Sequence, residues 1–275
     1  TASTNIAVGY QAAYSNATGV GLTAFGANTL YATTASDNCG IGTDNPGNYA
    51  AALESNTTGR FNTAVATGAL GSNTEGQNNT ALGHSTVENN TTGGFNVGIG
   101  HGALQANTTA DNNTAVGSQA LYTNTTGTNN TAHGYNALYS NTTANSNTAI
   151  GYNAQYSSTT ATNNTMLGTN AGYTTTTGSG SVGIGKSALY YNTTGANNIA
   201  LGYIALLDNT TGSDNVAVGK SALENNTTAA DNTAIGSDAM TTNTTGTANV
   251  AVGTSSLSSN TTASNNTAVG QASLA

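Results

Sequence analysis

Residues with the chemistry of catalysis or metal binding are few in this chain. Its 275 residues include only three histidines and eleven acidic residues. His84 and His101 follow equivalent glycines of a 17-residue repeat, so their imidazoles would lie on one exposed face, where a pair of them could hold a transition metal. Asp214 and Asp231 are related by the same spacing, but two monodentate carboxylates fall short of the six to eight oxygens that calcium prefers. We expect solvated side chains at both places and no metal site.

No arrangement of nucleophile, base and acid suggests an enzyme. The sequence contains neither a Ser/His/Asp spacing nor a phosphate-binding glycine motif before a helix, and its glycines belong to a repeat. We therefore expect a protein that is not an enzyme and that needs no cofactor.

Tyrosine is the one aromatic residue used generously, with 13 copies. Five tyrosines follow the same 17-residue period and are expected to form one continuous stack: Tyr122, Tyr139, Tyr156, Tyr173 and Tyr190. Such a strip could bind sugars through the apolar faces of their rings, as part of a cell-surface glycan or receptor. Alternatively, the rings stack on one another and shield an edge of the fold. We favour this second interpretation.

A column of Asn-Thr-Thr triplets also recurs, and each triplet matches a glycosylation acceptor. Its asparagines are Asn56, Asn90, Asn107, Asn124, Asn141, Asn192, Asn209, Asn226, Asn243 and Asn260. Sugars only about 4.8 Å apart would crowd one another. The preference of asparagine for chain corners explains this column better, and a second asparagine column four residues before the glycines indicates another corner.

Composition excludes several classes of partner. Charged residues make up 5% of the chain and the net charge is −8, with only three basic residues to neutralise phosphates. We therefore expect no binding to nucleic acid. The lone Cys39 cannot form an intrachain disulfide. No apolar run approaches the roughly 18 residues of a membrane-spanning helix, so we expect no membrane insertion.

All of these residues belong to one internal repeat. Glycines recur with a strict 17-residue period at Gly83, Gly100, Gly117, Gly134, Gly151, Gly168, Gly185, Gly202, Gly219, Gly236, Gly253 and Gly270. The pattern extends upstream through Gly9, Gly26 and Gly42 to Ala66, which replaces a glycine. About sixteen copies of a unit resembling N-T-A-V-G-x-x-A-L-x-x-N-T-T-G-x-N result, with a loop inserted near residues 43–49, around the only proline.

This repeat predicts an all-β fold. The unit is too short for a helical pair and is rich in residues that favour strands and tight turns. We expect a single domain over residues 1–275, a parallel β-solenoid in which each 17-residue copy is one coil and equivalent residues stack.

Alternation along the strand gives two faces. Large apolar residues before the glycine, such as Val116 and Ile184, point one way, and the small residues between them and the preceding Thr or Val point the other way. His133 occupies the large apolar column, where we expect a hydrogen-bonded core substitution. Because small residues allow a second backbone to approach, we expect an oligomer interface at Ala217, Ala234 and Ala251.

A family resemblance is carried by the segments N-V-A-V-G at 215–219 and 249–253 and N-I-A-L-G at 198–202. They resemble the N-S-V-A-I-G repeat in the heads of trimeric autotransporter adhesins, and the whole unit is similar to repeats of phage tail fibres. The resemblance implies a parallel β-roll, three of which pack around an axis as a homotrimer. The 17-residue unit is longer than the adhesin repeat, and we expect any stalk, anchor or chaperone domain to lie outside this fragment.

These features together favour a structural protein. We expect a rigid extracellular fibre segment, on a virion or a cell surface, that supports attachment as part of a phage tail fibre or an adhesin. One alternative is an ice-binding solenoid with hydroxyl ladders such as Thr108, Thr125, Thr142 and Thr193. Another is a head-to-tail filament subunit, suggested by the absence of a polar cap at either end.

Overall fold

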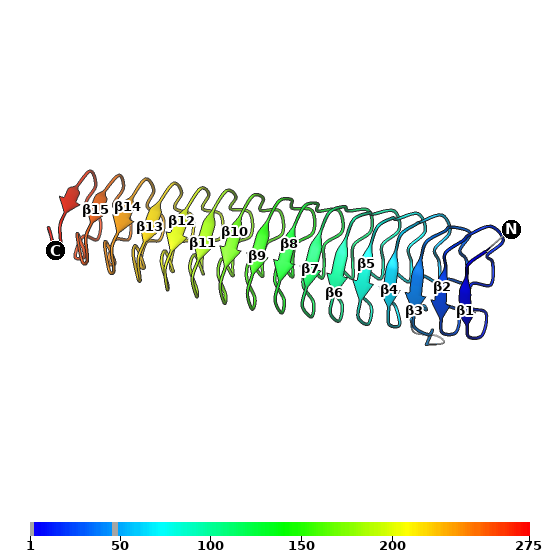
Figure 1. The fold of residues 1–275 in the computed structure, drawn as a ribbon. Coiled ribbons are helices and arrows are strands. Elements are labelled where there is room, and N and C mark those ends of the chain that lie inside the picture. The colour runs from blue at the N-terminus through cyan, green and yellow to red at the C-terminus, as the bar shows by residue number, and fades with distance from the viewer. Residues whose placement is uncertain (1–2, 46–48) are drawn as a thin grey trace. The chain divides into compact units, whose positions relative to one another are not determined.

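A computed structural model describes residues 3–45 and 49–275. The chain divides into two compact units, residues 1–143 and 144–275. The described residues form sixteen strands of three residues each and no helix. In Figure 1 the strands of each unit lie side by side and point the same way. The predicted all-β parallel solenoid with 17-residue coils is confirmed.

Each coil contributes one strand, and within each unit neighbouring strands pair in parallel. The first unit contains β1 (Ile6–Val8), β2 (Thr23–Phe25), β3 (Cys39–Ile41), β4 (Thr63–Val65), β5 (Thr80–Leu82), β6 (Val97–Ile99), β7 (Thr114–Val116) and β8 (Thr131–His133). The second contains β9 (Thr148–Ile150), β10 (Thr165–Leu167), β11 (Val182–Ile184), β12 (Ile199–Leu201), β13 (Val216–Val218), β14 (Thr233–Ile235), β15 (Val250–Val252) and β16 (Thr267–Val269). Paired residues keep the 17-residue period of the sequence in most pairs, as in Ala217 opposite Ala234.

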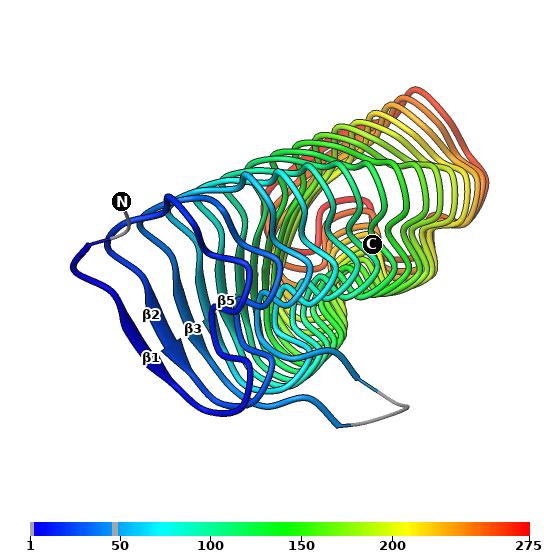
Figure 2. The same ribbon diagram turned by 90° about the vertical axis from the view of Figure 1, so that its right-hand side faces the viewer.

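The loop insertion falls between β3 and β4. There Asn45 and Tyr49 form an antiparallel bridge with two backbone hydrogen bonds of 3.0 and 3.2 Å. Residues 46–48, which include the proline of the predicted loop, lie outside the described residues. In Figure 2 the first coils follow nearly the same outline, and the chain leaves that outline next to this segment.

The interior of each coil is narrow. The middle residue of nearly every strand is a buried alanine or glycine, and Met166 replaces it in β10. Met166 fits because Gly172 and Gly183 leave room; a Cβ on either would come within 2.8 Å of its sulfur. A turn after the strand supplies the larger core residues, such as Leu121 and Leu189.

In that turn successive side chains do not alternate between the two sides of the chain. Ala120 and Leu121 are neighbours, and both are completely buried, whereas an extended chain would point them to opposite sides. Leu121 has a φ of +52°, a left-handed conformation that turns its side chain to the same side as that of Ala120. From sequence alone, alternation would place the two side chains of each such Ala-Leu pair on opposite sides, and the structure shows that this prediction is wrong.

Two buried asparagine columns hold the coils together. At the strand start, Oδ1 of each asparagine accepts the backbone N–H of its equivalent on the next coil, as from Asn79 to Asn62 at 3.0 Å. At the other corner the side-chain amides bond directly to one another, as from Asn90 to Asn73 at 2.7 Å. Asn79 and Asn90 both donate to the carbonyl of Gly93, so the two corners share one acceptor. Both predicted corners are present.

The glycine that ends each strand is required by the close approach of the coils. Its φ is positive, and a Cβ on Gly117 would lie 2.6 Å from the carbonyl oxygen of Gly134. Ala66 occupies this column with a φ of +107°, a conformation unfavourable for a residue with a Cβ.

We predict that Ala66→Gly stabilises the fold. Relief of the unfavourable backbone conformation outweighs the extra freedom of glycine in the unfolded chain, so the free energy of unfolding rises by about 1 kcal/mol. Equilibrium guanidinium unfolding followed by circular dichroism measures the change. Ala64→Gly, two residues earlier in the buried centre of β4, is the matched control and lowers stability. Loss of stability in Ala66→Gly contradicts the prediction.

We also predict that Asn215→Ala destabilises the second unit by about 2–3 kcal/mol. Oδ1 of Asn215 accepts the backbone N–H of Asn232 at 3.1 Å, and loss of that oxygen leaves a buried donor unpaired. Asn215→Ser costs less, because Ser181 occupies the same column and its hydroxyl accepts the N–H of Asn198 at 3.1 Å. Thermal unfolding of the two variants checks this order, and equal losses contradict it.

Candidate functional site

The most extensive candidate surface is the outward face of the strands. The middle residue is buried in every strand but β1, while the first and third residues of all sixteen strands are half-buried or exposed. We call the side chains of these first and third residues the strand face. The first is Thr, Val or Ile in nearly every coil, and the third is aliphatic in all but a few.

The strand face is regular and uncovered, and its third residue is apolar in every strand but β8, whereas nine of its sixteen first residues are threonine. Large side chains at its third position include Phe25 (55% exposed), Leu82 (47%), Leu167 (43%) and Ile235 (41%). Apolar patches that continue over many residues are rare on monomeric soluble proteins and mark interaction sites. In each unit the strand face is such a patch, formed by side chains repeated at the spacing of the coils.

The three predicted interface alanines lie on the opposite side of the same strands. Ala217, Ala234 and Ala251 are each 0% exposed in the single chain. Their side chains face the interior of their own coils, where the Leu turn packs, so none is available to another subunit. Their assignment to an oligomer interface is therefore wrong. The sequence indicated two apolar faces but not which of them the coil encloses.

The prediction that His133 is a core residue is wrong for the same reason. It is the third residue of β8 and is exposed, so it belongs to the strand face and not to the core.

The tyrosine column forms stacks within each unit. Ring centroids of Tyr122 and Tyr139 lie 5.2 Å apart with an interplanar angle of 2°. In the second unit Tyr156, Tyr173 and Tyr190 stack at 5.2 and 5.1 Å. A ring between two stacked neighbours has both faces covered, so a sugar cannot stack on it there. This geometry supports the interpretation that the rings shield one another.

His84 and His101 also stack, with centroids 5.5 Å apart, and Tyr49 meets His84 edge-on at 4.5 Å. Among the described residues no three His, Cys, Asp or Glu side chains come together as a metal site would require. Asp214 and Asp231 are exposed, and Oδ1 of Asp214 accepts a hydrogen bond from Asn197.

The Asn-Thr-Thr asparagines are buried in all coils but the last. Their amide nitrogens donate inside the coil, as from Asn226 to the carbonyl of Ala229 at 3.0 Å, so the folded chain does not present them to a glycosylating enzyme. The threonine hydroxyls next to them are also occupied. Thr108 and Thr125 donate to main-chain carbonyls of the following coil at 3.1 and 3.0 Å.

Three titratable groups have perturbed pKa values. Burial raises the pKa of the Cys39 thiol, which disfavours the nucleophilic thiolate. Burial, with Tyr173 and Tyr191 nearby, raises the pKa of Tyr190. Burial raises the pKa of Asp208, and the neighbouring Glu224 carboxylate adds to the shift. None of the three belongs to an arrangement able to transfer protons to a substrate.

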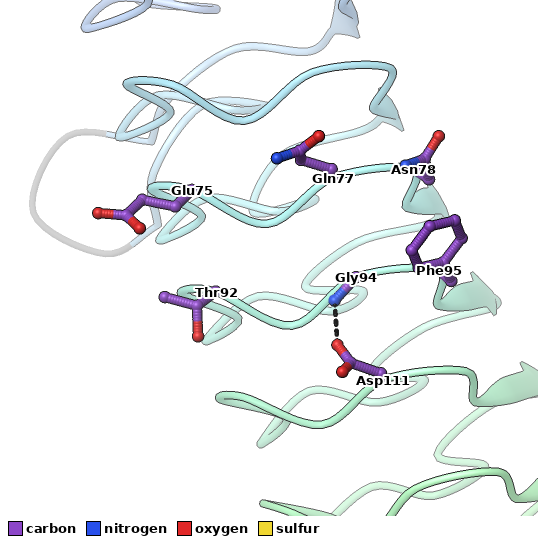
Figure 3. A pocket seen from close by; sticks show the side chains of 7 residues that line it. All are labelled: Glu75, Gln77, Asn78, Thr92, Gly94, Phe95 and Asp111. Carbon is purple, nitrogen blue, oxygen red and sulfur yellow. Dashed lines mark hydrogen bonds between the residues drawn. The ribbon is translucent and has the colours of Figure 1, made fainter.

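One small pocket interrupts the regular surface of the first unit. Its volume is about 250 Å³, and its lining is Glu75, Gln77, Asn78, Thr92, Gly94, Phe95 and Asp111. In Figure 3 Gly94 lies between Gln77 of the preceding coil and Asp111 of the following coil. Sequence reasoning missed this site. The signal was present as departures from the repeat, because Glu75 stands in a threonine column and Phe95 in a column rich in asparagine.

Comparison with known proteins adds no relationship. No protein-family model matches the chain, and no curated protein matches it significantly. No helix in the described ranges, 3–45 and 49–275, has the length and apolarity to span a membrane.

We predict that Asp208→Asn stabilises the chain near neutral pH and has no effect near pH 3, below the ordinary aspartate pKa of about 3.9. A raised pKa means that the folded state binds the proton more tightly than the unfolded state, so the aspartate chain loses stability as pH rises through the folded pKa. Asparagine does not ionise and avoids this loss. Melting temperatures across this pH range test the prediction, and a pH-independent difference contradicts it.

Proposed function

We propose that this chain is a segment of a rigid homo-oligomeric fibre, extracellular or on a virion, in which the strand faces of neighbouring copies pack together and the assembly supports attachment. The single observation that carries the proposal is the exposed apolar strand face. A folded chain that leaves so regular an apolar surface uncovered has a strong tendency to bury it.

The free energy gained by burying the strand face grows with the number of coils. Removal of a half-exposed Ile or Leu side chain from water contributes about 1 kcal/mol. Each additional coil adds another such side chain at the equivalent position, as with Leu167, Ile184 and Ile235 in the second unit. A long face of modest contacts is therefore able to offset the entropy lost on association.

The composition of the strand face favours a second copy of the chain as its partner. In the described strands the face carries no Asp, Glu, Lys or Arg side chain that would select an oppositely charged partner, and His133 is its one imidazole. Its repetition at the coil spacing presents the same surface on every copy of the chain. The resemblance to adhesin heads and tail fibres implies three copies. We retain the homotrimer in the proposal, with the strand face in place of the alanine face.

Ice binding is the second candidate, and it uses the same surface. The threonine ladder at the Asn-Thr-Thr corner is a poor candidate because its hydroxyls donate to the main chain. On the strand face, by contrast, Thr233 and Ile235 both point outward, and similar pairs recur at the coil spacing of about 4.8 Å. An oligomer that buries this face would hide it from ice, so the two functions exclude each other.

We predict that the double variant Ile184→Glu/Ile235→Glu is a monomer, whereas the wild type is a trimer. Carboxylates at the strand face lose their hydration if the face is buried, so association weakens while the strands remain. Sedimentation equilibrium at micromolar concentration measures the mass, and circular dichroism checks the β content.

The matched control is Tyr191→Glu. Tyr191 is 48% exposed and lies in the turn after β11, outside the strand face, so this variant stays trimeric. A monomeric wild type contradicts the fibre proposal, and thermal hysteresis in that monomer would assign the face to ice. A mass that rises without limit with concentration would instead indicate the head-to-tail filament.

A further inference from the structure

We propose that the pocket beside Gly94 is a binding site for a neutral sugar ring, with Phe95 as the apolar platform. Such a site goes beyond the structural role proposed above, because it makes the fibre segment itself a carbohydrate-binding surface. It does not require any particular oligomeric state.

The pocket exists because one coil lacks a side chain. Equivalent positions on neighbouring coils carry Gln77, Asp111 and Thr128, while Gly94 leaves a gap between the first two (Figure 3). The gap is kept open by a hydrogen bond, because the N–H of Gly94 donates to Oδ1 of Asp111 at 2.6 Å. The Asp111 carboxylate is thereby fixed at one side of the pocket.

The exposure and the backbone conformation of Phe95 are both unfavourable for folding. Its side chain is 61% exposed and its φ is +58°, a region that a bulky residue enters at a cost and that asparagine or glycine adopts more readily. Phe61, two coils earlier in the same column, is similar, but the guanidinium of Arg60 lies 5.0 Å from its ring centroid. The residue before Phe95 is glycine, so no such cation stabilises this ring. An exposed aromatic ring in a strained backbone indicates a binding function.

The polar groups around the ring distinguish between ligand classes. Gln77 and Asn78 supply both amide donors and carbonyl acceptors, while Glu75 and Asp111 supply acceptors. Sugar hydroxyls donate and accept, so they satisfy both kinds of group. An ammonium ion only donates and would leave the amide N–H groups without partners. The pocket volume of about 250 Å³ is just below the range of sites for drug-sized ligands, which suits a single ring.

Saturation-transfer NMR with the full chain tests the proposal. The probes are glucose, galactose, mannose, N-acetylglucosamine and fucose, each at millimolar concentration. We expect transfer to at least one of them, and a loss of affinity of about tenfold or more in Phe95→Ala and in Gly94→Thr. Gly94→Thr refills the gap with the residue found at Thr128 and Thr162. Because its Cβ would lie 3.1 Å from the carbonyl oxygen of Gln77, circular dichroism checks that this variant keeps its fold.

Phe61→Ala is the matched control, since Phe61 is exposed in the same column but does not line the pocket. Sugar binding persists in this variant if the proposal is correct. The absence of transfer to every probe overturns the proposal, as does transfer that survives both Phe95→Ala and Gly94→Thr. A change in the mass of the assembly with Phe95→Ala, without an effect on any sugar, would assign Phe95 to the oligomer interface and also overturn the proposal. If the wild-type chain does not self-associate, the fibre proposal fails but the sugar-binding measurement still tests the pocket.

Discussion

The structure depends on asparagine side chains that act as hydrogen-bond partners for the main chain of the next coil. Each strand has only three residues, too few for backbone pairing alone to fix the stack. Asn249 donates its backbone N–H to Oδ1 of Asn232, and the same bond recurs through most of each unit. The bond persists across the insertion, where the N–H of Asn62 reaches Oδ1 of Asn38, 24 residues earlier. This bond is kept although the chain between its two residues is longer here than in a regular coil, so it sets the register of the repeat.

The same buried polar columns leave little space for an apolar core. Two asparagines and a shared carbonyl occupy the interior of each coil, and what remains accepts a strand alanine and one larger residue such as Leu206 or Met240. Beta-branched and larger side chains are therefore directed outward on the strand. The apolar strand face is a consequence of the narrow interior, and assembly is one way to cover it.

Much of the fold could be predicted from the sequence, because in-register stacking turns spacing directly into geometry. The 17-residue period, the parallel pairing, the asparagine corners and the tyrosine stacks all follow from it. The inside and the outside could not be assigned, since alternation defines two faces without stating which one is enclosed. The left-handed conformation of Leu121 determines which face of the strand is enclosed, because it brings the larger apolar residue under the strand alanines. Tertiary packing selects that conformation, and local propensity does not favour it for leucine.

In a chain of near-identical coils, a departure from the repeat is informative when no neighbour compensates for it. Met166 is compensated by Gly172 and Gly183, and Ser181 keeps the hydrogen bond of the asparagine it replaces. Such changes are explained by folding alone. Phe95 beside Gly94 differs, because the ring is 61% exposed and the glycine opens a gap that other side chains would fill. Folding accounts for the regular coils and for the compensated changes, so the uncompensated pair Gly94 and Phe95 is the basis of the sugar site that we propose.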